Sequence, residues 1–401
     1  MKDTAALMQH EAESSLPEPD AQSAAHSDRV RAHITACIDR AGGAISFAEY
    51  MHQALYAPAL GYYCVGTTKF GKSGDFVTAP EVSSIFGGVL ARQCAPVLQE
   101  LESGSILELG AGTGKLARDL LDRLGELNAL PDQYLILEVS PELQARQKAL
   151  LRTEVPALAD RVAWISRLPR NFRGVVIGNE VVDALPVERF AIRPGGIMQL
   201  CVAVDRGEFT TSERPAPGYL ASAVEGIERS IGRNFSPGYA SEICCALPEW
   251  IAALAGAIDE GLVLLFDYGV SRREYYAEDR SDGWLRCHFR HRAHNDPLIL
   301  TGIQDITSWA DFTAIAAAAA DAELDVLGYT PQAQFLIAGG LQEELADIAK
   351  LGIDAQLGIA REVKLLTLPS EMGEHFKCIG LGRGTVSTPS AFSLADRTAA
   401  L

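Results

Sequence analysis

Three glycines at alternate positions, Gly110, Gly112 and Gly114, are the strongest sign of chemistry in this sequence. They follow a short apolar run at 105–109 that suits a buried parallel strand, and a helical period begins at Leu116. Because glycine has no Cβ, the backbone can bend tightly there and approach a ligand closely. Strand, glycine turn and helix together predict a nucleotide-binding corner.

Two acids narrow the class of ligand. The spacing G-x-G-x-G is not the dinucleotide fingerprint, and Leu116 follows Lys115 where a phosphate-binding loop needs Ser or Thr. Glu108, two residues before the first glycine, also disfavours a phosphate. Glu138 ends the next predicted strand, 134–139, where a carboxylate can accept both ribose hydroxyls. The combination resembles S-adenosylmethionine (SAM) binding by class I methyltransferases; a tight turn that holds nothing is the alternative.

Further polar residues follow the predicted fourth strand, 174–177. Asn179, Glu180 and Asp183 stand there in one short stretch. In open α/β sheets the ligand crevice lies beyond the carboxyl ends of the strands, so we expect these side chains near the reactive end of the cofactor. Asn179 is assigned to the cofactor, and Glu180 and Asp183 are the candidate catalytic acids. A solvated loop that carries two acids is the alternative.

A glycine-rich segment from 70 to 81, with aromatic and charged residues, is typical of a mobile loop that could cover a site. An ordinary surface loop before a helix near Pro80 is the alternative. The candidate lid or substrate residues in this segment are Gly74, Asp75, Phe76, Thr78, Pro80 and Glu81.

A second group of candidates lies after the predicted fifth strand, 262–266. Asp267 ends that strand, and His291 belongs to a long loop rich in Arg and His. Asp305 lies near the start of a helix predicted over 301–320. The histidines lack H-E-x-x-H or Cys/His spacing, so the sequence predicts no metal site.

Seven strands are predicted in all, with helices between the first five. They lie at 105–109, 134–139, 162–165, 174–177, 262–266, 324–327 and 376–381. The expected organisation is a disordered acidic tail (1–28), a helical region with the lid loop (29–100), a methyltransferase domain (101–189 and 256–382), an inserted substrate-binding region (190–255) and a disordered tail (383–401).

Composition limits the partners. The net charge of −17 over 401 residues disfavours a broad nucleic-acid surface and suits a cationic ligand, such as the SAM sulfonium or an arginine side chain. No apolar run is long enough to span a bilayer, and Lys2 is the only Lys or Arg in the first 28 residues. We therefore expect a cytoplasmic protein without membrane insertion, and leave a homodimer open.

Longer segments carry a family resemblance that runs from about residue 30 to 380. They include "FGKSGDFVTAPEVSSIFG", "LELGAGTGKLARDLL", "GNEVVDALPVERF", "LLFDYG" and "GIQDITSWADF". The chain resembles the SAM-dependent methyltransferase family of MidA and the mitochondrial complex I assembly factor that methylates arginine. The resemblance implies a class I, Rossmann-like α/β fold whose seventh strand is antiparallel, SAM as methyl donor, and protein arginine as acceptor.

The resemblance also implies symmetric dimethylarginine as product and a respiratory complex I subunit, or its homologue, as a substrate. The absence of a mitochondrial presequence indicates a bacterial member. Paired carboxylates can hold a guanidinium bidentately, which is why Glu180 and Asp183 rank above Glu81, Asp267, His291 and Asp305. A SAM-binding assembly chaperone and a small-molecule methyltransferase remain as alternatives.

Overall fold

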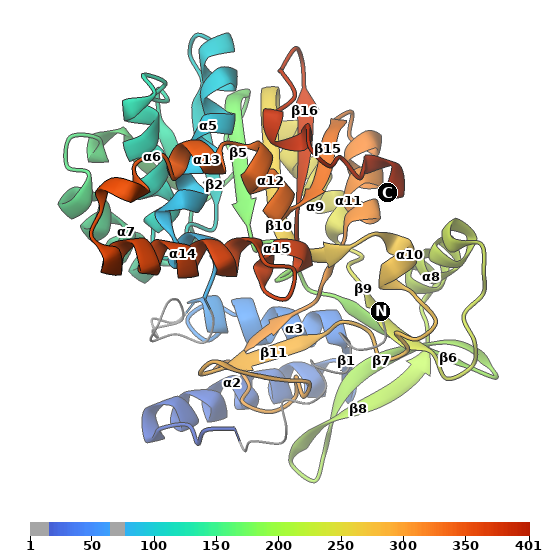
Figure 1. Ribbon diagram of the computed structural model, residues 1–401. Coiled ribbons are helices and arrows are strands. Elements are labelled where there is room, and N and C mark those ends of the chain that lie inside the picture. The colour runs from blue at the N-terminus through green and yellow to red at the C-terminus, as the bar shows by residue number, and fades with distance from the viewer. Residues whose placement is uncertain (1–15, 65–76) are drawn as a thin grey trace.

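The computed structural model describes residues 16–64 and 77–401, and its centre is a mixed eight-stranded sheet (Figure 1). The strand order is β15-β16-β10-β5-β2-β3-β4, and the short β14 pairs with β10. Their bounds are β2 (Ser105–Leu109), β3 (Tyr134–Leu137), β4 (Val162–Ile165), β5 (Phe172–Asn179), β10 (Ile258–Val270), β14 (Ala310–Asp311), β15 (Asp325–Pro331) and β16 (Phe376–Arg383). All seven predicted strands are present, and β16 is antiparallel to both of its neighbours, as predicted.

Helices cover both faces of this sheet because successive strand residues point to opposite sides. Ile106 and Leu264 pack with α5 and α6 on one face, whereas Leu107 and Val263 pack with α9 and α11 on the other. The helices of the first face are α5 (Ser84–Glu100), α6 (Lys115–Glu126), α7 (Pro141–Glu154) and α12 (Gln332–Ala338). Those of the second face are α9 (Leu247–Ala257) and α11 (Phe312–Asp321). The result is the three-layer α/β arrangement expected of a class I methyltransferase.

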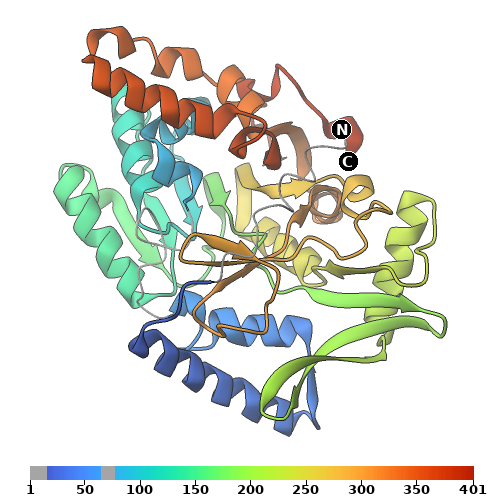
Figure 2. The same ribbon diagram turned by 60° about the horizontal axis from the view of Figure 1, so that its bottom comes forward.

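A second, antiparallel sheet joins segments far apart in the chain. It consists of β1 (Ala44–Ser46), β6 (Glu188–Arg193), β7 (Gly196–Asp205), β8 (Glu208–Pro215) and β9 (Ala240–Ile243). Figure 2 shows α2 (Ala21–Arg40) and α3 (Phe47–Tyr56) beside the β7–β8 hairpin, with α8 (Gly218–Ile231) at the far end. Since β1 pairs with β7, the N-terminal region and the predicted insertion form one structure rather than two.

The segment predicted as a long loop is partly folded. It contains α10 (Arg272–Tyr275), β11 (Arg286–Phe289) and β12 (Arg292–His294), and β11 also pairs, in one small sheet, with β13 (Asp305–Thr307), a strand within the segment predicted as a helix over 301–320. Cys287 and Ile306 of this sheet pack with Tyr50 and Met51 of α3. The remaining elements are α4 (Ala79–Val82), α13 (Leu341–Glu344), α14 (Ile353–Thr367), α15 (Met372–His375), η1 (Tyr62–Cys64), η2 (Ala159–Arg161), η3 (Ile348–Lys350), η4 (Ser390–Phe392) and η5 (Thr398–Ala400).

Several predicted boundaries are wrong. The helix expected over 301–320 begins only at Phe312, because Asp311 caps it by accepting the Ala314 N–H at 3.0 Å. No helix links β4 to β5, which are joined by residues 166–171. Helix α9 falls within the predicted insertion, yet it packs on the central sheet.

Both predicted tails also differ. Helix α2 begins at Ala21, within the tail predicted over 1–28, and Asp20 caps it; residues 1–15 lie outside the described part of the chain. The segment 383–401 is folded rather than disordered. Phe392 is buried there against Phe335 of α12, with ring centroids 5.6 Å apart. The polar composition of this segment led to the prediction of disorder. Its one buried aromatic residue, Phe392, is held by contacts with residues far away in the sequence.

Among the described residues, no helix is both long enough and apolar enough to cross a bilayer.

Candidate active site

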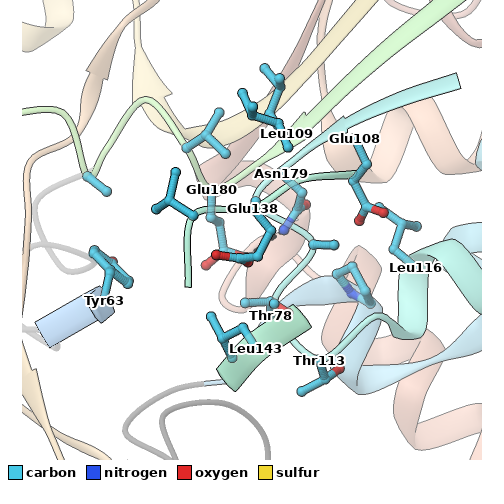
Figure 3. Close-up of a pocket in the computed structure, with 18 of the residues that line it drawn as sticks. Tyr63, Thr78, Glu108, Leu109, Thr113, Leu116, Glu138, Leu143, Asn179 and Glu180 are labelled. Atoms are coloured by element: carbon cyan, nitrogen blue, oxygen red, sulfur yellow. Dashed lines mark hydrogen bonds between the residues drawn. The ribbon is translucent and has the colours of Figure 1, made fainter. Parts of the chain in front are cut away.

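A cavity of about 480 Å³ opens beyond the carboxyl ends of β2, β3 and β5. This volume is within the range of about 300–1,000 Å³ that is typical of small-molecule sites. Figure 3 shows Glu138, Asn179 and Glu180 near the centre of the view, with Thr78 and Thr113 below them and Tyr63 to one side. The cavity therefore lies where the fold predicts a ligand, at the switch point between β2 and β5.

The glycine turn forms the floor of this cavity. Gly110, Gly112 and Gly114 have φ angles of 68°, 52° and 90°, a left-handed region that side chains other than glycine rarely adopt. Gly110 and Gly112 line the cavity. Gly114 does not; a Cβ built on it would lie 3.2 Å from Cγ of Gln147, so it allows α6 and α7 to pack closely.

Glu138 lines the cavity and is held from behind. Its carboxylate accepts the Ser140 N–H at 2.9 Å and Nε2 of Gln147 at 3.2 Å. Nε2 of Gln147 also donates to the carbonyl of Gly112 at 2.9 Å, and Trp164 donates its indole N–H to Oε1 of Gln147. Gln147 thus ties the acid to the glycine turn, a role that no local sequence signal revealed.

Glu108 also borders the cavity, but its side chain is only 2% exposed. The hydroxyl of Tyr134 donates to its Oε2 at 2.7 Å. Burial raises the pKa of Glu108 to about 7, because the charged form loses water that one hydrogen bond does not replace.

The loop after β5 brings Glu180 into the cavity in a strained conformation, with φ of 55°. The Glu180 N–H donates to the carbonyl of Phe266 at 2.8 Å. Oδ2 of Asp267 accepts the next three backbone N–H groups, from 181, 182 and 183, at 3.2, 2.8 and 3.2 Å. Asp267 does not line the cavity, so its carboxylate shapes the loop instead.

Asp183 is buried within the same loop and does not line the cavity in this conformation. Burial, followed by the charge of Asp267, raises the pKa values of Glu180 and Asp183 well above their ordinary range. Burial also raises the pKa of Asp267 to about 7. In the described part of the chain, none of these three acids forms an ion pair with Lys or Arg, so no cation there stabilises their ionised forms.

Two tyrosines of the N-terminal region contact other parts of the chain: Tyr56 contacts the loop at 180–185 after β5, here called the acidic loop, and Tyr63 contacts β13. Tyr63 lines the cavity and donates to Oδ1 of Asp305 at 2.7 Å, while Tyr56 donates to the carbonyl of Ala184 at 2.9 Å. Their rings stack with centroids 5.5 Å apart. Asp305 lies on β13 behind these tyrosines and does not line the cavity. His291 lies on the β11–β12 turn, exposed and away from the cavity lining.

Of the candidate lid residues, Gly74, Asp75 and Phe76 lie outside the described residues. Thr78, Pro80 and Glu81 line the cavity. The Glu81 carboxylate accepts hydrogen bonds from Oγ1 of Thr113 and, at 2.7 Å, from Nζ of Lys115. The Glu81 carboxylate is therefore paired with residues of the glycine turn, and in this arrangement it is not available to bind the substrate that accepts the methyl group.

Sequence reasoning did not assign several lining residues. They include Tyr56, Tyr63, Thr113, Lys115 and Trp250. Thr113 and Lys115 lie inside the glycine motif and could have been included from that position. The tyrosines and Trp250 come from α3, η1 and α9, and only the fold brings those elements to the cavity.

Comparison with known proteins identifies the class of protein. Residues 89–330 match a family model described as "Putative S-adenosyl-L-methionine-dependent methyltransferase". The chain is 30% identical to "Protein arginine methyltransferase NDUFAF7, mitochondrial" of Danio rerio, over 84% of this chain and 83% of that protein. It is 28% identical to the corresponding Drosophila melanogaster homolog, over 86% and 83%.

A crystal structure from Burkholderia thailandensis, with S-adenosyl-homocysteine bound, superimposes with a TM-score of 0.91. It is 40% identical and covers 96% of this chain and 100% of its own. The chain therefore belongs to this family of SAM-dependent methyltransferases, and its cofactor is SAM.

The residues present suit that cofactor. Oδ1 of Asn179 is buried at the cavity and has no hydrogen-bond partner among the described residues, so it is a ready acceptor for a ligand. Gly110 leaves room at the turn, with only Cγ1 of Val181 within 4 Å of a built Cβ. The described residues include no group of three or more His, Cys, Asp or Glu suited to a metal ion.

Proposed function

We propose that this protein transfers the methyl group of SAM to an arginine of another protein. The observation that carries the proposal is the acidic loop: Glu180 lines the cavity, and Asp183 and Asp267 lie behind it without a cationic partner in the described chain. A guanidinium would supply the missing positive charge. The relatives named as protein arginine methyltransferases support the same acceptor.

In this proposal, the cofactor is held by the residues around the glycine turn. Gly110 and Gly112 give the adenosine close access to the backbone, and Glu138 accepts hydrogen bonds from the ribose hydroxyls. Asn179 accepts a hydrogen bond from the amino group of the methionine part through its unpaired Oδ1. Glu108 supports the glycine turn from within the protein, because its buried carboxyl group accepts a hydrogen bond from Tyr134.

When bound, SAM supplies an electrophilic methyl group on a sulfonium centre. Glu180 accepts N–H groups of the guanidinium and holds one nitrogen in line behind that methyl, which provides most of the rate by positioning. As the nitrogen–carbon bond forms and the carbon–sulfur bond breaks, the nitrogen loses a proton, and Glu180 is placed to take it. Asp183 adds a second carboxyl group beside Glu180, and the two acids together favour the binding of a cation.

The decisive experiment uses extract from cells that lack the gene as acceptor, with isotopically labelled SAM. We expect label on arginine of a protein, identified by mass spectrometry. Glu180→Gln should slow the transfer about tenfold to a hundredfold, because it loses a charge-assisted contact of about 1.5–3 kcal/mol with the guanidinium. Asp183→Asn should slow it as well, because it removes a negative charge beside Glu180. Their SAM affinity should stay within about twofold of wild type.

Glu142→Gln, which alters an exposed acid at the start of α7, is the matched control. SAM binding without any transfer would favour the assembly chaperone, and label on small metabolites alone would favour a small-molecule enzyme. Rapid transfer by both acid variants would show that the two acids are structural.

The product and its setting are narrower proposals. The family resemblance supports symmetric dimethylarginine on a respiratory complex I subunit or its homologue, and the similarity to the Burkholderia thailandensis structure supports a bacterial cell as the setting. Fragmentation of the labelled peptide distinguishes symmetric from asymmetric dimethylarginine, and its sequence identifies the acceptor.

A further inference from the structure

A second cavity, of about 430 Å³, lies on the other side of the acidic loop. Val181, Ala184 and Leu185 of this loop line the first cavity, whereas Val182 and Val187 line the second. Neighbouring residues of one backbone segment therefore face the two cavities. The loop that carries Glu180 and Asp183 thus lies between the two cavities, together with α9, whose residues also line both.

The second cavity is lined mainly by apolar side chains of α8, α9 and α11. Of its three charged lining residues, Arg272 and Asp311 neutralise each other, because Nε of Arg272 lies 2.8 Å from Oδ2 of Asp311, and the third, Asp321, is exposed to solvent. Tyr219 lies at the rim with 54% of its surface exposed, and its hydroxyl donates to Glu188 at 2.8 Å. This lining favours an uncharged, apolar occupant that enters from solvent past an aromatic ring.

An aromatic wall connects this cavity to the acidic loop. Trp309 lines the cavity and stacks on Trp284, with ring centroids 4.1 Å apart. The ring centroid of Tyr268 lies 6.3 Å from that of Trp309. Tyr268 directly follows Asp267, which anchors the loop. Next to Trp309, Ser308 donates its N–H to the carbonyl of Asp183 at 2.9 Å. The wall and the acidic loop are thus fixed relative to each other.

We propose that the second cavity binds an apolar side chain of the acceptor protein, close in sequence to the arginine that is methylated. The inference rests on the proposed function, since the guanidinium must reach Glu180. An extended peptide advances about 3.3 Å per residue, so a side chain within about four residues of the arginine can reach across one loop. In this arrangement, Glu180 and Asp183 select the guanidinium of the arginine, and the second cavity selects the apolar residue close to it in the acceptor sequence.

The test fills the cavity from α8. Gly226 lines it, and a Cβ built there has only Nη2 of Arg229 nearby, at 3.8 Å, so Gly226→Phe can enter without a backbone clash. Gly256→Phe on α9 is the matched control, because Gly256 is exposed, has open space around it and lines neither cavity. Ala223→Phe, also on α8, replaces Gly226→Phe if that variant does not fold.

The first measurement uses a library of arginine-centred peptides with varied flanking residues. Wild type and Gly256→Phe should prefer an aromatic or aliphatic residue at one position within about four residues of the arginine. Gly226→Phe should lose that preference and show a KM for the best peptide raised about tenfold or more, which corresponds to about 1.4 kcal/mol, with kcat and SAM affinity unchanged. A wild-type preference in Gly226→Phe would overturn the inference.

The second measurement separates this inference from the proposed function. Binding of N-acetyl-phenylalaninamide is followed by saturation-transfer NMR, without SAM. If wild type methylates no arginine peptide but binds this probe, and Gly226→Phe does not, the cavity stands as an apolar side-chain site and the arginine proposal fails. If wild type methylates no peptide and the probe binds neither protein, or binds both equally, the inference is overturned.

Discussion

Glu108 and Glu138 show how two carboxylates around one cavity can differ in character. Glu138 is held by the backbone N–H of Ser140 and by the side-chain amide of Gln147. Glu108 has one hydroxyl partner, Tyr134, and lies in an apolar environment. Hydrogen-bond donors favour an ionised acid, whereas burial favours the protonated form, and burial is the main reason why the pKa of Glu108 is raised.

We predict that Glu108→Gln changes how stability depends on pH. The pKa of Glu108 is raised from 4.5 to about 7 in the folded protein, so the native state holds a proton that the unfolded chain releases between these values. Stability from this group is therefore complete below about pH 4.5 and is lost as pH rises toward 7. Gln keeps an acceptor for Tyr134 and does not titrate.

Wild type should thus lose on the order of 3 kcal/mol relative to the variant between about pH 4 and pH 8. Urea unfolding at a series of pH values, without cofactor, measures this difference. Parallel curves for the two proteins would contradict the assignment.

Asp267 is the residue on which the shape of the acidic loop depends, because one of its oxygens accepts three consecutive N–H groups. We predict that Asp267→Ala costs about 1–3 kcal/mol of stability, since buried donors lose their acceptor. Methyl transfer should fall because Glu180 is no longer held in place, while SAM affinity changes little. Hydrogen exchange at 181–183 should rise in the variant; unchanged exchange there would show that the contact is dispensable.

At the scale of elements, the sequence predicted what depends on local pattern. Apolar runs located seven of the eight strands of the central sheet, all but the two-residue β14, and the glycines located the ligand-binding edge of that sheet. Pairings between distant segments, such as β1 with β7 and β11 with β13, leave no local signal. Because their positions depend on such long-range contacts, Tyr56 and Tyr63 were not assigned to the site although they line the cavity. His291 was assigned to the site although it does not line the cavity.

The C-terminal segment offers a test of such long-range packing. Phe392 is 3% exposed and lies against β15 and β16 where Gly328 and Gly380 leave space for its ring. We predict that Phe392→Ala lowers the free energy of unfolding by about 3–5 kcal/mol. Leu394→Ala, two residues away and 57% exposed in the wild type, should change it by less than about 0.5 kcal/mol. Equal effects in thermal or urea unfolding would mean that the tail is not packed.

At the scale of the whole molecule, the cavity lies between the central sheet and the N-terminal region. The central sheet supplies the glycine turn, Glu138 and Glu180, and the N-terminal region supplies Tyr56 and Tyr63. Motifs in the sheet could be identified from sequence because strand, turn and acid are contiguous. The opposite wall could not, because its position depends on the pairing of β1 with β7, which joins the N-terminal region to the second sheet.

The charge of the whole chain leads to the last prediction. A net charge of −17 creates a negative field that attracts a cationic acceptor, and salt screens that field over about 10 Å at 0.1 M. If the acceptor is an arginine peptide, kcat/KM for one flanked by Lys should fall about tenfold or more between about 0.02 and 0.3 M salt. A peptide flanked by Asp, otherwise identical, should fall less or rise, because screening removes repulsion. Initial rates measured at saturating SAM test this, and the same salt dependence for both peptides would show that the overall field does not steer the acceptor.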